Sequence, residues 1–309
     1  MRFWKNLESR FRPATVVLCY HRVTDQTDDL FNCCVTPKHF AEHLEVLRGL
    51  DVVHPFTRLL DAHQPHKWPG RRTAIVTFDD GYADNIFNAA PLLAQHCMPA
   101  VFYIFTGWMT PPSEAWWDRL QNAIFNAATL PPILHLPGID EEIATSNRTT
   151  LFHSIYLLLR NRGVKAREEI LARLEASPRN MQVRLTHRPM NPDELRQLAA
   201  QPGIHIGAHT VSHSYLPSLT PADQQFEIAA SREWLECELG RPIKDFSYPH
   251  GGIDAGARAA AAAAGMETGV TCEERATRAG NDPLSIPRFM VHDWDGDEFA
   301  KRVAWWFTC

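Results

Sequence analysis

The sequence lacks the features of several large protein classes. It has no segment of about 18 consecutive apolar residues, so no transmembrane helix is expected. It has no long basic segment, and its formal net charge of −5 at pH 7 gives no electrostatic support for binding nucleic acid. The N-terminal segment MRFWKNLESRFRPA is followed by too short an apolar run for a secretory signal. We therefore expect a cytoplasmic protein, with peripheral contact to a membrane as the alternative.

The cysteines show no disulfide or zinc-finger pattern. There are seven of them, an odd number, and no CxxC spacing occurs. Disulfide scaffolds and zinc fingers use paired cysteines at short spacings, so this pattern favours reduced thiols. The residues are Cys19, Cys33, Cys34, Cys97, Cys237, Cys272 and Cys309.

The sequence does contain an alternation of β-rich and helical segments. ATVVLCYH, AIVTF and PAVFYIF are typical of buried strands, and 36–50 and 82–97 have helical patterns. Further strands are expected at GIHIGAHT, DFSYP and TGVTC. Between them lie a helix with an apolar face through Phe226 and an alanine-rich helix, 255–264, that stops at Gly265. Such βα units predict an α/β fold with a parallel sheet, which forms a barrel with eight units and an incomplete one with fewer.

The segment from about Gly107 to Pro192 departs from this alternation. It contains Trp116 and Trp117, a proline-rich turn and helical patterns such as LFHSIYLLLR and AREEILARLEA. We interpret it as a helical insertion, 107–192, between two βα units.

Reactive polar residues follow four of the expected strands. In an α/β sheet or barrel, groups that act on a ligand lie at the carboxyl ends of the strands. Asp79 and Asp80 are adjacent carboxylates that repel each other and do not belong in a core, so something must offset their cost. The candidate groups are His21, the pair Asp79-Asp80, His209 with His213, and the turn Tyr248-Pro249.

Two histidines and a carboxylate among these groups suggest a metal site. His209 and His213 are four residues apart, so on a helical turn they would share a face and bind one ion. With one Asp they would form the ligand set of a catalytic zinc, or of another divalent metal, with an open position for water. The second Asp would then be free to take a proton. The alternative is that these are solvated or core histidines, because a chain with 15 histidines produces such spacings by chance.

Three motifs make the chain similar to a known family. TFDDGY, HTVSH and FSYPHG, in this order, resemble the central motifs of the polysaccharide deacetylases, the NodB-homology or carbohydrate esterase family 4 enzymes. The resemblance covers roughly 14–106 and 200–295. It implies a distorted, incomplete (β/α) barrel of the NodB type, with 1–309 as a single catalytic domain that contains the insertion 107–192.

The resemblance also implies roles for individual residues. Asp79 would be the general base, and the backbone N–H of Tyr82 would help to hold the oxyanion. Tyr248 and Pro249 would line the acetate end of the groove. The ligands of one divalent metal ion, with Zn²⁺ expected, would be Asp80, His209 and His213.

The implied activity is the metal-dependent removal of acetyl from an N-acetylated sugar in a polysaccharide or its precursor. Two alternatives come from other classes. One is a non-catalytic saccharide-binding protein of the same fold, whose signature would be a missing ligand or base. The other is an O-deacetylase or a hydrolase of a different amide, which the motifs do not separate because they report the metal chemistry and not the sugar.

The sequence departs from the family pattern at two positions. The Arg usually found near Ser247, which pairs with the base, is missing, and Arg288 is a candidate replacement with a surface ion pair as the alternative. The acid histidine is either His21 or His292. The segments YHRV and PRF..DWDGDEF resemble the exopolysaccharide- and capsule-synthesis branch, in which some members carry permuted motifs. This favours His21 as the general acid, His292 as a surface or packing residue, and a location beside a polysaccharide-synthesis complex.

The remaining aromatic and imidazole residues are given ordinary structural roles. Tryptophans are more often core residues than sugar platforms, although aromatic faces do stack on pyranose rings. His39, His43 and His96 lie on expected helices and are expected to be solvated. The tryptophans in question are Trp68, Trp116, Trp117, Trp294, Trp305 and Trp306.

Overall fold

The computed structural model describes residues 14–26, 28–50, 72–109, 114–139, 143–176, 183–278 and 280–309. Residues 1–13 of the N-terminal segment considered as a signal, and Trp68, lie outside these ranges. In the described part of the chain, no helix combines the length and apolar character needed to span a membrane.

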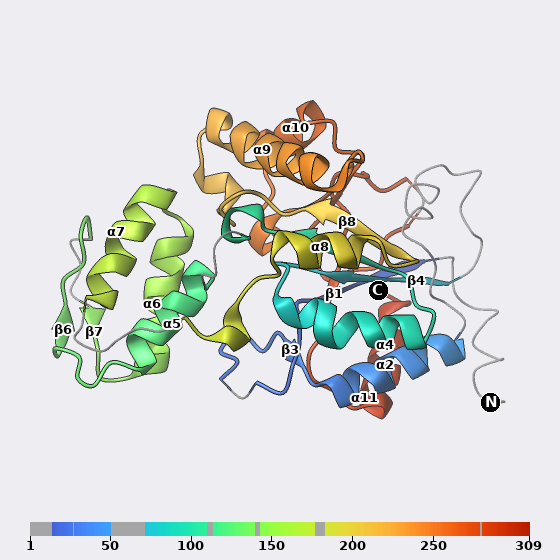
Figure 1. The fold of residues 1–309 in the computed structure, drawn as a ribbon, viewed down its shortest axis with the longest axis horizontal. Helices are drawn as coiled ribbons and strands as arrows, with labels where there is room; N and C mark the ends of the chain where they lie inside the picture. Colours follow the sequence, from blue (N-terminus) through green and yellow to red (C-terminus); the bar gives the residue numbers. More distant parts are fainter. Residues whose placement is uncertain are drawn as a thin grey trace.

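A seven-stranded sheet forms the centre of the molecule, and all of its strand pairs are parallel (Figure 1). The order is β10-β9-β8-β5-β4-β1-β11. The strands from β4 to β10 therefore lie on one side of β1, and the last strand, β11, pairs with β1 on its other side. The sheet curls into an incomplete barrel surrounded by helices, which confirms the predicted fold class. The strands are β1 (Thr15–Tyr20), β4 (Thr73–Phe78), β5 (Ala100–Ile104), β8 (Ile204–Ala208), β9 (Asp245–Ser247), β10 (Thr268–Val270) and β11 (Phe289–Met290).

Helices cover the outer surface of this sheet (Figure 1). They are α2 (Pro37–Leu50), the π-helix η1 (Asn85–Ala89) that leads into α4 (Ala90–Gln95), α8 (Pro192–Ala199), α9 (Pro221–Leu239), α10 (Ala255–Ala263) and α11 (Gly296–Trp306). Short elements complete this part: the strands β2 (Arg22–Val23) and β3 (Cys34–Val35), and the 3₁₀ turns η2 (Thr106–Trp108), η3 (Leu185–His187), η4 (Leu216–Ser218) and η5 (Pro249–Gly251).

The segment between β5 and β8 contains a helical unit that projects to one side (Figure 1). In this unit, helix α5 (Trp116–Phe125) packs against α6 (Arg148–Arg160) and α7 (Val164–Glu175). Trp116 and Trp117 are both buried, and the ring of Trp117 packs against those of Trp108 and His213 outside the unit, so they are core residues and not an exposed platform. The unit consists of α5 (Trp116–Phe125), α6 (Arg148–Arg160), α7 (Val164–Glu175) and the hairpin β6 (Ile133–Leu134) to β7 (Ile143–Ala144).

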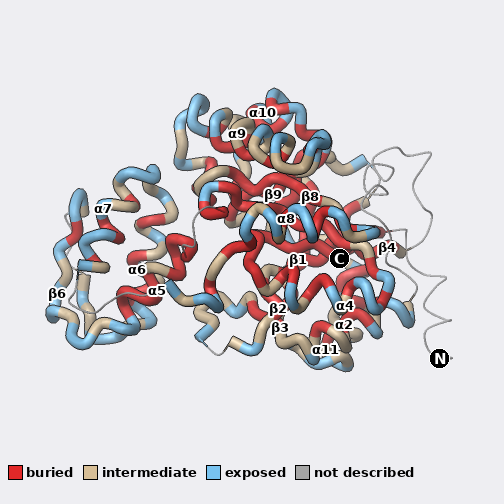
Figure 2. The backbone as a smooth tube through the Cα atoms, in the orientation of Figure 1, coloured by how far each residue is buried: buried red, intermediate tan, exposed pale blue. Residues whose placement is uncertain are grey.

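The strands of the sheet are buried in the centre of the molecule (Figure 2), and the alternation of their side chains produces two apolar clusters. Leu18 and Phe78 belong to the large cluster under the helices, and Val17 and Ile75 to a small one on the inner face. Side chains two residues further along from Val17 and Ile75 stay on the inner face. The inward-facing side chains of β1 and β4 therefore lead to His21 and Asp79, which directly follow these two strands.

The expected exposure of His43 and His96, and the expected apolar face through Phe226, are wrong. His43 is fully buried because it shares the apolar face of α2 with Phe40, Leu44 and Leu47, and His96 is buried as well. On α9 the side chain of Phe226 is 62% exposed. The face of α9 that packs on the protein carries Gln224, Glu227, Ile228, Ser231 and Leu235 instead.

Candidate active site

The reactive residues converge at the carboxyl edge of the sheet. In the register between β1 and β4, Tyr20 lies opposite Phe78, so His21 and Asp79 occupy the next pair of positions. The Asp79 N–H donates to the Tyr20 carbonyl oxygen at 3.0 Å. Similarly, the His209 N–H donates to the carbonyl oxygen of Ile104, at the end of β5, at 3.0 Å. The strand ladder thus brings residues that are far apart in sequence to one edge.

Asp80, His209 and His213 form a buried cluster of three potential metal ligands. Their ligand atoms lie within 4.8 Å of one another. Oδ1 of Asp80 lies 3.5 Å from Nε2 of His209 and 3.2 Å from Nε2 of His213. This oxygen is buried and has no hydrogen-bond partner among the described residues.

A hydrogen bond fixes the tautomer of His209. Its Nδ1 donates to the Ser247 carbonyl oxygen at 2.7 Å, so the neutral ring carries a lone pair on Nε2. That lone pair faces the carboxylate of Asp80 in a buried site, where two acceptors repel unless a cation lies between them. The donor set and its unsatisfied oxygen therefore fit a divalent metal ion, and two nitrogens with one oxygen are ligands that Zn²⁺ accepts.

The two histidines meet through a loop and not through the helical turn that their spacing suggested. Residues 209–213 contain no helix. Thr210 and His213 have positive φ angles of 66° and 52°, and Asp80 has a φ of 74°. Non-glycine residues in this region are strained, and such residues concentrate at functional sites. The carboxylate of Glu227 holds the loop by accepting hydrogen bonds from the N–H groups of Val211 and Ser212 at 2.9 and 2.8 Å.

Asp79 takes part in a buried ion pair with Arg288. Nη1 of Arg288 lies 2.7 Å from Oδ1 of Asp79, and Nη2 lies 2.6 Å from Oδ2. Arg288 is fully buried, so the alternative of a surface ion pair is wrong. The hydroxyl of Ser247 donates to Oδ2 of Asp79 at 3.0 Å, and the same hydroxyl oxygen lies 3.0 Å from Nη2 of Arg288. An arginine that directly precedes β11 thus lies beside Asp79 and Ser247, where the third motif supplies none.

This ion pair determines the charge of Asp79. Burial raises the pKa of the carboxyl, but the charge and hydrogen bonds of Arg288, together with the neighbouring imidazoles of His209 and His21, outweigh burial and lower the pKa to about 2. Asp79 is therefore ionised at neutral pH and can accept a proton.

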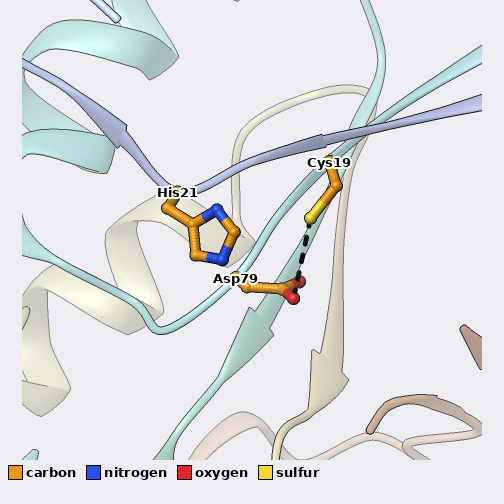
Figure 3. Close-up of side chains that lie close together, drawn as sticks. All are labelled: Cys19, His21 and Asp79. Atoms are coloured by element: carbon orange, nitrogen blue, oxygen red, sulfur yellow. Dashed lines mark hydrogen bonds between the residues drawn. The ribbon is translucent and has the colours of Figure 1, made fainter. Parts of the chain in front are cut away.

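His21 lies beside Asp79, and His292 has partners elsewhere. The ligand atoms of His21, Asp79 and Cys19 lie within 4.8 Å of one another (Figure 3). Nδ1 of His21 is buried without a hydrogen-bond partner in the described ranges. His292 donates from Nδ1 to the Asn32 carbonyl oxygen at 2.6 Å, and its ring packs edge-on against Trp294. This geometry favours a packing role for His292.

The other expected site residues are Tyr82, Tyr248 and Pro249, and hydrogen bonds fix the side chains of the two tyrosines. Tyr82 is buried, and its hydroxyl donates to Oδ2 of Asp118 at 2.7 Å. No hydrogen bond from its backbone N–H is found in the described part of the chain, so that group is available. Tyr248 is fully buried, and its hydroxyl donates to the Leu284 carbonyl oxygen at 3.0 Å. Any contact of Tyr248 with a ligand would therefore come from its backbone. Pro249 is buried beside it, at the start of η5.

Three residues near the reactive groups, Cys19, His250 and Tyr156, were not predicted from the sequence. Cys19 lies in β1, two residues before His21, so the two side chains project to the same face of the chain. His250 packs edge-on against the ring of His213 at 4.6 Å, and its Nδ1 lies 3.0 Å from the Tyr156 hydroxyl of α6. No pattern in the sequence indicates that α6 reaches this site.

Comparison with known proteins decides the family. The sequence profile described as "Polysaccharide deacetylase" matches residues 66–125 and 145–269, more than half of the chain. The chain belongs to the polysaccharide deacetylase family. This confirms the resemblance drawn from the three motifs.

The chain has similar relatives among curated proteins and solved structures. YxkH of Bacillus subtilis (strain 168), a polysaccharide deacetylase by name, is 23% identical over 283 residues, which cover 91% of this chain and 72% of YxkH. The Streptococcus pyogenes deacetylase PplD in complex with acetate has a TM-score of 0.63 and 16% identity, covering 94% of this chain and 98% of PplD. A de-N-acetylase from Aggregatibacter actinomycetemcomitans has a TM-score of 0.58 and 15% identity, covering 94% and 99%. At these identities the structural neighbours support the fold alone.

Proposed function

We propose that this deacetylase removes the acetyl group from an N-acetylated sugar of a polysaccharide or its precursor, with the help of one divalent metal ion. The observation that carries the proposal is that two adjacent carboxylates have different partners. Asp80 lies with His209 and His213, whereas Asp79 lies outside that set and is paired with Arg288. The acetate bound to PplD and the name of the de-N-acetylase are consistent with this chemistry.

The metal ligands would be Asp80, His209 and His213, and Zn²⁺ is the ion that we expect. When bound there, such an ion polarises the amide carbonyl and acidifies water, which a base as weak as Asp79 needs.

The protein's own groups would then handle the protons. A carboxylate oxygen of Asp79 accepts a proton from the attacking water, while Arg288 keeps that carboxylate ionised beforehand. The free N–H of Tyr82 donates to the oxyanion of the tetrahedral intermediate. His21 gives a proton to the departing nitrogen, because an amide anion is too basic to leave unaided. The backbone at Tyr248 and Pro249 would border the acetyl group.

The domain division also remains a proposal. We treat 1–309 as one catalytic domain with a helical insertion at 107–192. The contact between Tyr156 of α6 and His250 supports it, because His250 packs against the ligand candidate His213.

The alternatives differ in what they require of these residues. A saccharide-binding protein has no need of a buried ionised carboxylate beside a metal set, and here ligands and base are all present. An O-deacetylase would use the same groups but depend less on His21, because an alkoxide is a far better leaving group than an amide anion.

The experiment measures acetate release from matched panels of N-acetylated and O-acetylated glycans. The protein is stripped of metal, assayed, and assayed again after one equivalent of Zn²⁺ is restored. We expect zinc-dependent release from an N-acetylated glycan, and in Asp79→Asn a loss of about 10²–10⁴-fold with metal binding retained. An Asp79→Asn protein with normal metal content and near-wild-type release contradicts the assignment of the base. Release from O-acetylated glycans alone contradicts the assigned substrate.

A further inference from the structure

A second set of metal-ligating side chains lies beside the first. The sulfur of Cys19, an imidazole nitrogen of His21 and a carboxylate oxygen of Asp79 lie within 4.8 Å of one another. Figure 3 shows the Cys19 thiol and the His21 imidazole both close to the Asp79 carboxylate; Cys19 lies in β1, and His21 directly follows that strand. The sets share no residue, because the first consists of Asp80, His209 and His213.

The strand geometry explains why these three residues meet. Cys19 and His21 are two residues apart, so their side chains project from the same face of the chain. In the parallel pairing, Cys19 lies opposite Thr77 and Tyr20 opposite Phe78, which brings Asp79 next to His21. The thiol of Cys19 lies 3.8 Å from Oδ2 of Asp79. Backbone hydrogen bonding of two adjacent strands therefore holds the set in place without any ion.

We propose that Cys19, His21 and Asp79 form a second binding site for a zinc-like divalent cation. Thiolate, imidazole and carboxylate are the three side chains that zinc uses in proteins, and three of them leave one position for water. Cys19 and Asp79 are almost completely buried, at 1% and 2% exposure. Nδ1 of His21 is buried without a hydrogen-bond partner in the described part of the chain, so no hydrogen bond through this atom fixes the tautomer of the ring.

Charge makes this site weaker than the first. Asp79 already binds both Nη groups of Arg288, whose positive charge repels a cation. Room for a ligand bond remains, because a carboxylate has about four acceptor positions. Arg288 and Ser247 use three of these positions, and the Cys19 thiol uses the fourth until it loses its proton to bind the ion. Binding forms a bond between the ion and the Cys19 sulfur and breaks the S–H bond, so one proton is released to solvent for each ion bound.

Occupation of this site would block the reaction. It removes Asp79 and His21 from proton transfer at once, and this consequence rests on the proposed function, in which they are base and acid. We therefore expect that one equivalent of zinc supports turnover and that an excess inhibits it.

Spectroscopy with Co²⁺ tests the site without any assay of activity. Thiolate bound to Co²⁺ gives a charge-transfer band in the near ultraviolet, and the Asp80–His209–His213 set contains no thiol. We expect this band to develop with the second equivalent of Co²⁺ added to the metal-free protein, together with the release of one proton. Cys19→Ala and the volume-conserving Cys19→Ser should lose the band and still bind the first equivalent. Asp80→Ala should keep the band.

Two other cysteines serve as controls. Cys97→Ala removes an exposed thiol, and Cys272→Ala removes the thiol that is hydrogen-bonded to Cys19, with its sulfur 4.0 Å from Nη2 of Arg288, but that lies outside the three-residue set. Both should retain the band. A band that survives in folded Cys19→Ala or Cys19→Ser, or that disappears in Cys272→Ala or Cys97→Ala instead, overturns the assignment. The absence of any thiolate band in the wild-type protein overturns it as well.

Inhibition then tests the consequence. Acetate release is measured against rising free Zn²⁺, and each protein is compared with its own rate at one equivalent. We expect the zinc concentration that halves the rate to rise at least tenfold in Cys19→Ser. Equal inhibition of both proteins overturns the link between this site and turnover. If no glycan releases acetate at all, the proposed function fails while the cobalt experiment still decides whether the site exists.

Discussion

Arg288 donates hydrogen bonds to both carboxylate oxygens of Asp79, at 2.7 and 2.6 Å, and both residues are buried. The arginine precedes β11, which pairs with β1, and Asp79 follows β4, which pairs with the other side of β1. The Nε of Arg288 donates to the Thr271 carbonyl oxygen at 2.9 Å, which fixes the guanidinium in its plane. The last strand of the sheet therefore supplies the positive charge that the third motif lacks.

The first prediction concerns this ion pair. Arg288→Met leaves a buried carboxylate without its countercharge, and Asp79→Asn leaves a buried guanidinium without one. Each change should lower the free energy of unfolding by about 3–5 kcal/mol, because an uncompensated buried charge is costly. The double variant should lose much less than the sum of the two. Urea unfolding of the four metal-free proteins at pH 7 measures the coupling.

An exposed pair is the control for this cycle. Lys244 and Glu267 form an ion pair at 2.6 Å with both side chains largely exposed. Lys244→Met should cost less than about 1 kcal/mol. Additive losses in the Asp79 and Arg288 variants would show that the two side chains are not energetically coupled.

The second prediction concerns the metal set. His213→Ala removes one of three ligands, so purified protein should lose bound metal as well as activity. Elemental analysis after dialysis against one equivalent of Zn²⁺ measures the stoichiometry. His205→Ala is the matched control, because His205 lies on β8 but outside the ligand set. Full retention of metal by His213→Ala would falsify the ligand assignment.

The third prediction concerns the pH dependence of stability. Burial lowers the pKa of His43 to about 4, in spite of the hydrogen bond that its Nε2 donates to the Trp294 carbonyl oxygen at 2.7 Å. The unfolded histidine binds its proton near pH 6.5, so between pH 6.5 and 4 the unfolded state holds more protons than the folded state. The contribution of His43 is therefore complete above pH 6.5 and is lost as the pH falls. The loss between pH 7 and pH 5 amounts to roughly 2 kcal/mol.

A comparison with His43→Gln isolates this contribution. Other buried groups titrate in the same range; Asp118, for example, has a pKa that burial raises to about 7, with the opposite effect on stability. The glutamine amide can still donate to the Trp294 carbonyl oxygen but does not titrate. The stability advantage of the wild type over His43→Gln should shrink by roughly 2 kcal/mol from pH 7 to pH 5. An advantage that stays constant over this range would contradict a neutral buried His43.

The sequence predicts the sheet well, because strands of a parallel sheet are buried on both faces and appear as continuous apolar runs such as TVVLCY and AIVTF. It predicts β11 poorly, because that strand has two residues. The burial of His43 was predictable, since residues 40, 43, 44 and 47 have the spacing of one helix face.

Other parts of the site depend on contacts that no local pattern encodes. Arg288 and Asp79 are 209 residues apart in the sequence, and only the return of β11 to β1 brings them together. The spacing of His209 and His213 suggested a helix, but positive φ angles at Thr210 and His213 form a loop that the carboxylate of Glu227 holds. The extent of the insertion, 107–192, stays a prediction.

The last prediction separates the two candidate acids. His21 lies within 4.8 Å of Asp79 at the edge that carries the metal set, whereas Nδ1 of His292 donates to Asn32. A general acid must hold its proton, so loss of that proton produces the alkaline limb of the pH–rate profile. His21→Ala should lower kcat by about 10²–10⁴-fold on an N-acetylated glycan and remove this limb. His292→Ala is the control and should keep both the limb and most of kcat. If His292→Ala abolishes the limb and His21→Ala retains it, the acid lies after β11 and not after β1.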